Sequence, residues 1–159
     1  MKKRFVCLLL ATPLLLAAQV TAPEGFEQWT SADLGRVGQA ISADAAADPH
    51  HFAVKQLVDF PNEAFLLVHR EADGQVEWHE TQIDIFFVQS GSATLVVGGT
   101  YLNGETVAPH EKRNGAIQGG VRQKLSASDI VRIPARVPHQ VLLDGAHEFT
   151  YLVVKVKGY

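Results

Sequence analysis

Three side chains of metal-binding types occur in apolar surroundings in the chain. Glu77-Trp78-His79 reads as extended backbone, in which alternate residues project to the same face, so Glu77 and His79 can reach one ion together. Asp84 lies inside the apolar run 83–88, and a carboxylate buried there must be paired, hydrogen-bonded or bound to a metal. The short turn 80–82 between them would let His79 and Asp84 face the same interior from neighbouring strands.

His139 extends this group from a distant part of the sequence. It follows Pro138 at the start of an apolar run in which Val141 and Leu143 share its face. A histidine on an apolar face is more often a core residue, but together with His79 and Asp84 it favours a metal site. Two imidazoles and one carboxylate suit Fe(II), Mn(II), Zn(II) or Ni(II) and leave coordination positions open.

Glu77 has three possible roles in such a site. It could be a fourth ligand, it could act as a catalytic general base, or it could orient His79 from outside the ligand set. A second carboxylate ligand would favour Mn(II) or Fe(II) over copper. Gln82 is a further possible ligand through its carbonyl oxygen and ranks behind Asp84.

Arg136, three residues before His139, could bind a substrate carboxylate through two parallel hydrogen bonds, although a solvated loop arginine is the simpler interpretation. The polar segment 100–120 is longer than a tight connection requires and could partly cover a binding site. The role of His69 stays open. We expect the remaining histidines to be solvated: His50, His51, His110 and His147.

Short apolar runs separated by turn residues predict an all-β barrel or sandwich from about residue 51 to the C-terminus. Asp73-Gly74 is typical of a hairpin turn, and Ser90-Gly91 predicts a break between two strands. The runs are Phe52–Phe60, Ala64–Arg70, Gln75–His79, Ile83–Gln89, Thr94–Val97, Glu105–Val107, Val121–Leu125, Ile130–Ile133, Gln140–Leu143 and Phe149–Val156.

Residues 23–50 are expected to form one helix and a linker before the barrel, which occupies residues 51–159. The helix should span Thr30–Ile41, with Thr30 or Ser31 as N-cap and Asp33 in its first turn. The small residues of 43–49 then predict a linker.

Residues 1–22 have the pattern of a secretory signal peptide, with Lys2, Lys3 and Arg4 before a short apolar run. Cleavage is expected after Ala18 or Ala22, which would place the protein in the periplasm or outside the cell, free of the membrane. The only cysteine, at position 7, would leave with the peptide. Loss of three of the 14 basic residues leaves 11 against 17 acidic residues, a formal charge of −6 that disfavours nucleic acid as a partner.

These residues resemble the two motifs of the cupin superfamily. Glu77-x-His79-x4-Asp84-x6-Gly91 is similar to the first motif, Gly-x5-His-x-His-x3,4-Glu-x6-Gly, with Glu77 where the family has its first histidine and Asp84 in place of its glutamate. Ser128-x5-Pro134-x-Arg136-x2-His139 is similar to the second, Gly-x5-Pro-x-Gly-x2-His-x3-Asn, with other residues at both glycines and the asparagine.

The resemblance implies a double-stranded β-helix, a divalent metal ion such as Fe, Mn or Zn held by His79, Asp84 and His139, and a homodimer. It also implies metal-dependent oxygenase, isomerase, lyase or hydrolytic chemistry on a small organic molecule, without choosing among them. Two alternatives remain open: a non-catalytic module that binds a small molecule in the periplasm, and a structural protein that assembles through strand edges.

Overall fold

The computed structural model describes residues 21–159, so the predicted signal peptide lies outside the described residues except for Thr21 and Ala22. Among the described residues, no helix has both the length and the apolar character needed to cross a membrane.

Helix α1 spans Ser31–Ala47. Thr30 is its N-cap: the Thr30 hydroxyl accepts a hydrogen bond from the Asp33 amide, and the Asp33 carboxylate accepts one from the Thr30 amide. The predicted helix end at Ile41 was wrong, because the alanine-rich segment continues the helix instead of forming a linker. Alanine has the highest intrinsic helix propensity, and Ala45 is fully buried.

The described residues form twelve strands, in agreement with the predicted all-β barrel. The strands are β1 (Phe52–Asp59), β2 (Glu63–Arg70), β3 (Glu77–His79), β4 (Gln82–Val97), β5 (Thr100–Leu102), β6 (Glu105–Ala108), β7 (Glu111–Arg113), β8 (Ala116–Gln118), β9 (Val121–Ser126), β10 (Ile130–Ile133), β11 (His139–Leu142) and β12 (Phe149–Lys157).

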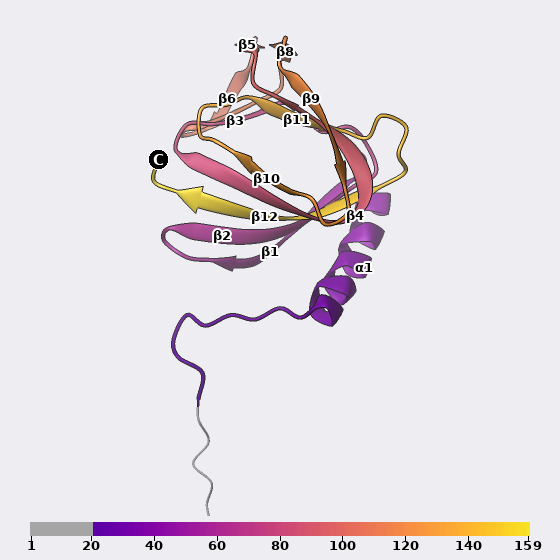
Figure 1. The fold of residues 1–159 in the computed structure, drawn as a ribbon, viewed down its shortest axis with the longest axis vertical. Helices are drawn as coiled ribbons and strands as arrows, with labels where there is room; N and C mark the ends of the chain where they lie inside the picture. Colours follow the sequence, from indigo (N-terminus) through magenta and orange to yellow (C-terminus); the bar gives the residue numbers. More distant parts are fainter. Residues whose placement is uncertain (1–20) are drawn as a thin grey trace, which may run out of the picture.

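Two antiparallel layers face each other and share strand β4 (Figure 1). The first half of β4 pairs with β12 and β10 in a layer that continues through β2 to β1. Its second half pairs with β9 and β11 in a layer that continues through β3 and β7 to β6. Strands β5 and β8 form a separate two-stranded antiparallel sheet at the top of Figure 1.

The predicted break at Ser90-Gly91 is instead a bend within β4. The pairing of β4 with β12 shifts by one residue beside it, and Gly91 has φ +76°. A Cβ at Gly91 would lie 2.2 Å from the carbonyl oxygen of Glu148, so a glycine is required for the two strands to approach. The bend lets one strand serve both layers.

Asp73-Gly74 also differs from its predicted role. It does not join two paired strands but carries the chain from β2 in one layer to β3 in the other. The Gly74 amide donates to the Val141 carbonyl (2.7 Å), and an Asp73 carboxylate oxygen accepts from the Leu143 amide (2.7 Å). These bonds attach the crossover to the end of β11.

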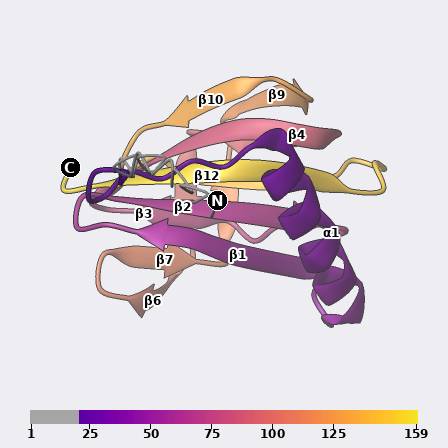
Figure 2. The ribbon, with the colours of Figure 1, turned by 90° about the horizontal axis from the view of Figure 1, so that it is seen from below.

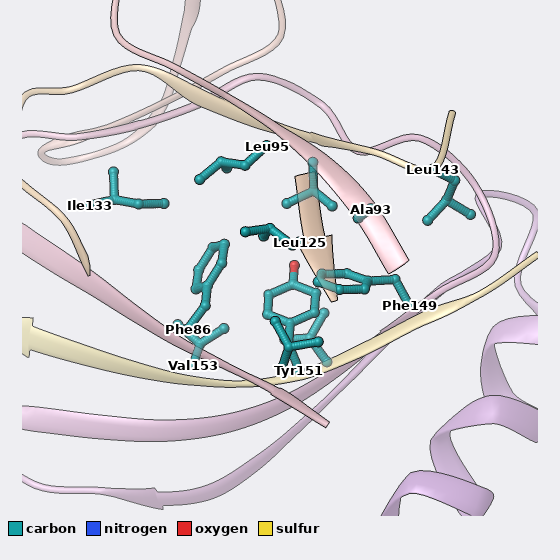
Figure 3. Packing of buried hydrophobic residues seen from close by; sticks show 12 residues of the cluster. Phe86, Ala93, Leu95, Leu125, Ile133, Leu143, Phe149, Tyr151 and Val153 are labelled. Atoms are coloured by element: carbon teal, nitrogen blue, oxygen red, sulfur yellow. The ribbon is translucent and has the colours of Figure 1, made fainter. Parts of the chain in front are cut away.

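The hydrophobic core lies between the layers (Figure 3). Phe149 and Tyr151 of β12 stack with ring centroids 4.9 Å apart, and Tyr151 lies 4.7 Å from Phe86 of β4. Helix α1 packs outside the barrel against β1 and β2, as Figures 1 and 2 show. The core therefore holds the two layers together.

Candidate metal centre

Glu77, His79, Asp84 and His139 converge between the two layers, with one potential ligand atom from each lying within 4.8 Å of the others. Glu77 and His79 project together from β3, as their spacing predicts. His139 is the register partner of Glu77 on β11, and Asp84 approaches from β4 in the opposite layer. The fold thus brings together all four residues that the sequence singled out around the metal.

His139 has a free nitrogen inside this cluster. Its Nδ1 donates to the carbonyl oxygen of Val137 at 3.1 Å, which leaves the lone pair on Nε2. Nε2 is buried, has no hydrogen-bond partner and lies 3.6 Å from Oδ2 of Asp84. A buried acceptor without a donor is costly, so the lone pair of His139 fits a metal ion at this point.

His79 is held in the same tautomer by a carboxylate. Oε2 of Glu111 lies 2.6 Å from Nδ1 of His79, and because a carboxylate can only accept, Nδ1 carries the proton. Nε2 of His79 is 3.2 Å from Oδ2 of Asp84. Burial lowers the pKa of His79, but the adjacent carboxylates of Asp84 and Glu111 outweigh it and raise the pKa above its ordinary value.

Asp84 is an ionised carboxylate in a nearly closed environment, with 2% of the residue exposed. Burial raises its pKa, but the neighbouring imidazoles of His139 and His79 and the ammonium of Lys155 reverse this effect and hold the pKa well below the usual range. Asp84 therefore supplies the fixed negative charge that a divalent ion needs.

Glu77 pairs with two arginines and with His79. Its Oε1 lies 3.2 Å from Nη2 of Arg70, and its Oε2 lies 3.4 Å from Nη1 of Arg113 and 3.6 Å from Nε2 of His79. Burial raises the pKa of Glu77, but His139, Arg113, Lys155 and Arg70 together bring it below the ordinary value. A carboxylate stabilised in its charged form is a weak base, so these contacts favour a ligand or anchoring role over general base catalysis.

Four charged residues that contact the cluster were not identified in the sequence analysis: Arg70, Glu111, Arg113 and Lys155. Glu111 and Arg113 lie on β7, in register with His79 and Glu77 of β3. They belong to the polar segment 100–120, which was expected only as a cover. Lys155 is the register partner of Asp84 on β12, and its alternation with Tyr151 and Val153 was the one signal that could have placed it inside the barrel.

A cavity of about 640 Å³ adjoins the cluster and is open enough for a small organic molecule. Its walls combine apolar and charged side chains. Apolar contributions include Phe52, Leu66, Val68, Phe86 and Val153, and the charged ones include Arg70, Glu77, Asp84, Arg113 and Lys155. The cavity is therefore suited to hold the apolar part of a small molecule beside cationic side chains and the candidate metal ligands.

Arg136 is not among the residues that line this cavity, and it is exposed. Its contribution to the site runs through the backbone: with φ +64°, its amide donates to the carbonyl oxygen of His79 at 2.7 Å. This bond ties the loop before His139 to β3. The cationic side chains that line the cavity are instead Arg70, Arg113 and Lys155.

The other histidines lie outside the cluster. His69 is buried beneath α1 on the outer face of β2, where Nδ1 is 2.8 Å from the Thr150 hydroxyl. His110 is exposed and pairs with Glu80, and His147 is exposed. His50 and His51 are exposed as expected, but they also line the rim of the cavity. Gln82 is half-buried at the start of β4.

No family model and no curated protein matches the sequence. Among solved structures, the chain is similar to a protein with a double-stranded β-helix domain from Klebsiella pneumoniae (16% identity, TM-score 0.51, covering 67% of this chain and 73% of that one). It is also similar to the cupin domain of Cnp3 from Schizosaccharomyces pombe (11% identity, TM-score 0.51, covering 67% and 64%).

A weaker similarity is to the DMSP lyase DddQ from Ruegeria pomeroyi (18% identity, TM-score 0.48, covering 66% of this chain). The matched region spans less than two thirds of that chain (46%) and of the Cnp3 domain. At these identities the similarities concern the fold. The chain has the double-stranded β-helix fold of the cupin superfamily, as its two sequence motifs predict.

Proposed function

We propose that this protein is a metal-dependent enzyme that acts on a small organic molecule bound in the cavity beside the cluster. His79, Asp84 and His139 would hold a divalent ion such as Fe, Mn or Zn, with Glu77 as a fourth ligand. The observation that carries the proposal is the buried, unpartnered Nε2 of His139, which lies 3.6 Å from the Asp84 carboxylate. Bound there, the metal would supply a Lewis acid or an oxygen-activating centre.

The protein's own residues have distinct roles in this proposal. Glu111 fixes the tautomer of His79 and presents its lone pair to the ion. Arg113, half-buried at the cavity wall, pairs through Nη1 with Glu77 and Glu111, and its other N–H groups would pair with an anionic group of the substrate. Arg70 is more strongly constrained, because it donates to the Tyr151 hydroxyl and to Glu77. We assign it the role of anchoring Glu77.

Metal content tests the proposal directly. The protein is purified without a histidine tag, supplied with Mn(II), Fe(II) or Zn(II), and analysed by elemental mass spectrometry. We expect stoichiometric metal in the wild type and its loss in His139→Ala. His147→Ala removes an exposed histidine far from the cluster and serves as the matched control. A wild type without stoichiometric metal would rule out the metal-dependent function.

A non-catalytic binding module is the second candidate, favoured by one observation. The ammonium of Lys155 lies 2.8 Å from Asp84, so the cluster has a positive partner of its own. In this alternative the cavity holds a small molecule without turnover. A metal-loaded protein that binds small acids but shows neither oxygen uptake nor product formation across an aerobic substrate panel would favour it.

We further propose that residues 1–22 direct export to the periplasm or the medium and that the barrel forms a homodimer. Export is supported by the basic and apolar pattern of the N-terminus. Mass spectrometry of the exported protein would locate the cleavage at Ala18 or Ala22, and light scattering would give the solution mass. Retention of the uncleaved chain in the cytoplasm, or a monomeric mass, would contradict the respective proposal.

A further inference from the structure

Lys155 of β12 contacts the same atoms that would bind the metal. Its Nζ lies 2.8 Å from Oδ1 and 3.0 Å from Oδ2 of Asp84, and 3.1 Å from Nε2 of His79. The position follows from the sheet register, because Lys155 stands directly opposite Asp84 on the neighbouring strand. Three protons of one ammonium thus face three candidate ligand atoms.

These contacts are incompatible with a metal ion on the same atoms. An ammonium group only donates, so it uses the lone pairs of Asp84 and His79 that a cation would use. It is also a positive charge within hydrogen-bond distance of the ligand atoms, where a divalent ion would repel it strongly in a poorly solvated environment. The lysine and the ion are therefore alternatives for one set of acceptors.

Lys155 is freer to move than Asp84 and His79, because its side chain reaches the cavity. Asp84 is 2% exposed, whereas the side chain of Lys155 is 20% exposed and lines the cavity. A lysine side chain is an unbranched stem with many rotamers, so its ammonium can move into the cavity without rearrangement of the strands. The side chains of His79 and Asp84, at 3% and 2% exposure, have no comparable freedom.

We propose that Lys155 is an internal competitor for the metal ion: its ammonium occupies the acceptors of Asp84 and His79 in the metal-free chain and must withdraw before a divalent ion binds. This inference rests on the proposed metal-dependent function and deepens it. It explains how the buried Asp84 charge is balanced without metal, and it makes the occupancy of the site depend on the supply of metal.

The experiment measures metal affinity, not activity. Mn(II) and Zn(II) are titrated calorimetrically into the wild type, Lys155→Met and Lys155→Gln. Both variants remove the ammonium, Met keeps the length of the stem, and Gln keeps a neutral donor. Lys157→Met is the matched control, because it is the same change on the same strand at a lysine that pairs with Asp59 and the Phe60 carbonyl.

We expect both Lys155 variants to bind metal about tenfold to a hundredfold more tightly than the wild type, the range that follows from the loss of a charge-assisted competing interaction. Lys157→Met should bind like the wild type. Thermal unfolding is the second readout: without metal the Lys155 variants should melt lower than the wild type, and metal should raise their Tm by more.

The outcomes of this experiment bear differently on the competition by Lys155 and on the proposed metal-dependent function. Wild-type affinity in both Lys155 variants would overturn competition by Lys155 and leave the metal-dependent function intact. Metal binding by the variants but not by the wild type would support competition and overturn metal dependence of the native chain. Absence of binding in every protein would overturn both. If the variants fold only in the presence of metal, competition is supported; if they fold under neither condition, it is overturned.

Discussion

The Glu111 carboxylate lies 2.6 Å from Nδ1 of His79 and thereby orients the Nε2 atom of that histidine toward Asp84. The two residues are register partners on β7 and β3. A carboxylate that hydrogen-bonds a ligating histidine makes the imidazole a better donor to a metal and fixes its orientation. Glu111 is therefore part of the candidate metal centre, where it would orient His79 without itself binding the ion.

This pairing predicts weaker metal binding when Glu111 is removed. Glu111→Ala should raise the dissociation constant for Zn(II) or Mn(II) by about tenfold to a hundredfold, as for other partners of ligating histidines. Calorimetric titration measures the change. Glu105→Ala, at an exposed carboxylate of the adjacent strand β6, is the control and should bind metal normally. Unchanged affinity in Glu111→Ala would show that His79 needs no such partner.

A second prediction compares the two arginines that could bind a substrate carboxylate. Arg113 lines the cavity, whereas Arg136 is exposed outside it. Arg113→Met should weaken binding of hexanoate, a probe with one carboxylate and an apolar chain, by about tenfold because a charge-assisted hydrogen bond is lost. Arg136→Met should have a smaller effect. A larger loss in Arg136→Met, measured by calorimetry at equal metal content, would restore Arg136 as the substrate clamp.

A third prediction concerns the stability of Gly91→Ala, which follows from the backbone conformation of this residue. With φ +76° and the Glu148 carbonyl 2.2 Å from an added Cβ, Gly91→Ala combines an unfavourable backbone conformation with a steric clash. We expect a loss of at least about 2 kcal/mol in the free energy of unfolding. Gly35→Ala is the opposing control: it lies in α1 with open space around it, and should stabilise the protein by about 0.5–1 kcal/mol.

Urea denaturation of both glycine variants provides the measurement. If Gly91→Ala were as stable as the wild type, the bend in β4 would not require glycine.

The raised pKa of Tyr151 predicts that the folded protein loses stability at alkaline pH. Burial raises its pKa, and although Arg70 opposes the shift, the pKa stays above the ordinary value. The unfolded chain therefore releases this proton at lower pH than the folded chain. Protonated Tyr151 therefore contributes to the free energy of unfolding below its pKa in the unfolded chain, about 10. This contribution is lost as the pH rises toward the higher pKa of the folded chain.

Chemical denaturation between pH 8 and pH 11 tests this prediction against Tyr151→Phe, the window being set by the ordinary tyrosine pKa of about 10. The stability of the wild type should fall relative to that of Tyr151→Phe as the pH rises above about 10. A constant difference between the two proteins over this range would contradict a raised pKa.

Local sequence patterns predicted which face of a strand carries Glu77 and His79, which buried polar residues need partners, and where α1 begins. Two-residue alternation placed Glu77 and His79 on one face of a strand, and the apolar context of Asp84 and His139 required partners for both. The capping residues Thr30 and Asp33 predicted the start of α1. These features depend on residues close in sequence. There, the alternation of residues and the free-energy cost of burying a polar group can be judged from the sequence alone.

Only the tertiary structure decided which distant side chains surround the centre. Lys155 is opposite Asp84, and Glu111 is opposite His79, because of registers between strands far apart in the sequence. A register is set by the packing of the whole sheet, and a shift of one residue would turn either side chain to the other face. The bend at Gly91 likewise became clear only where β4 meets the chain at Glu148. Tertiary contacts therefore decided which charged side chains and which cavity surround a cluster whose candidate ligands the sequence had already indicated.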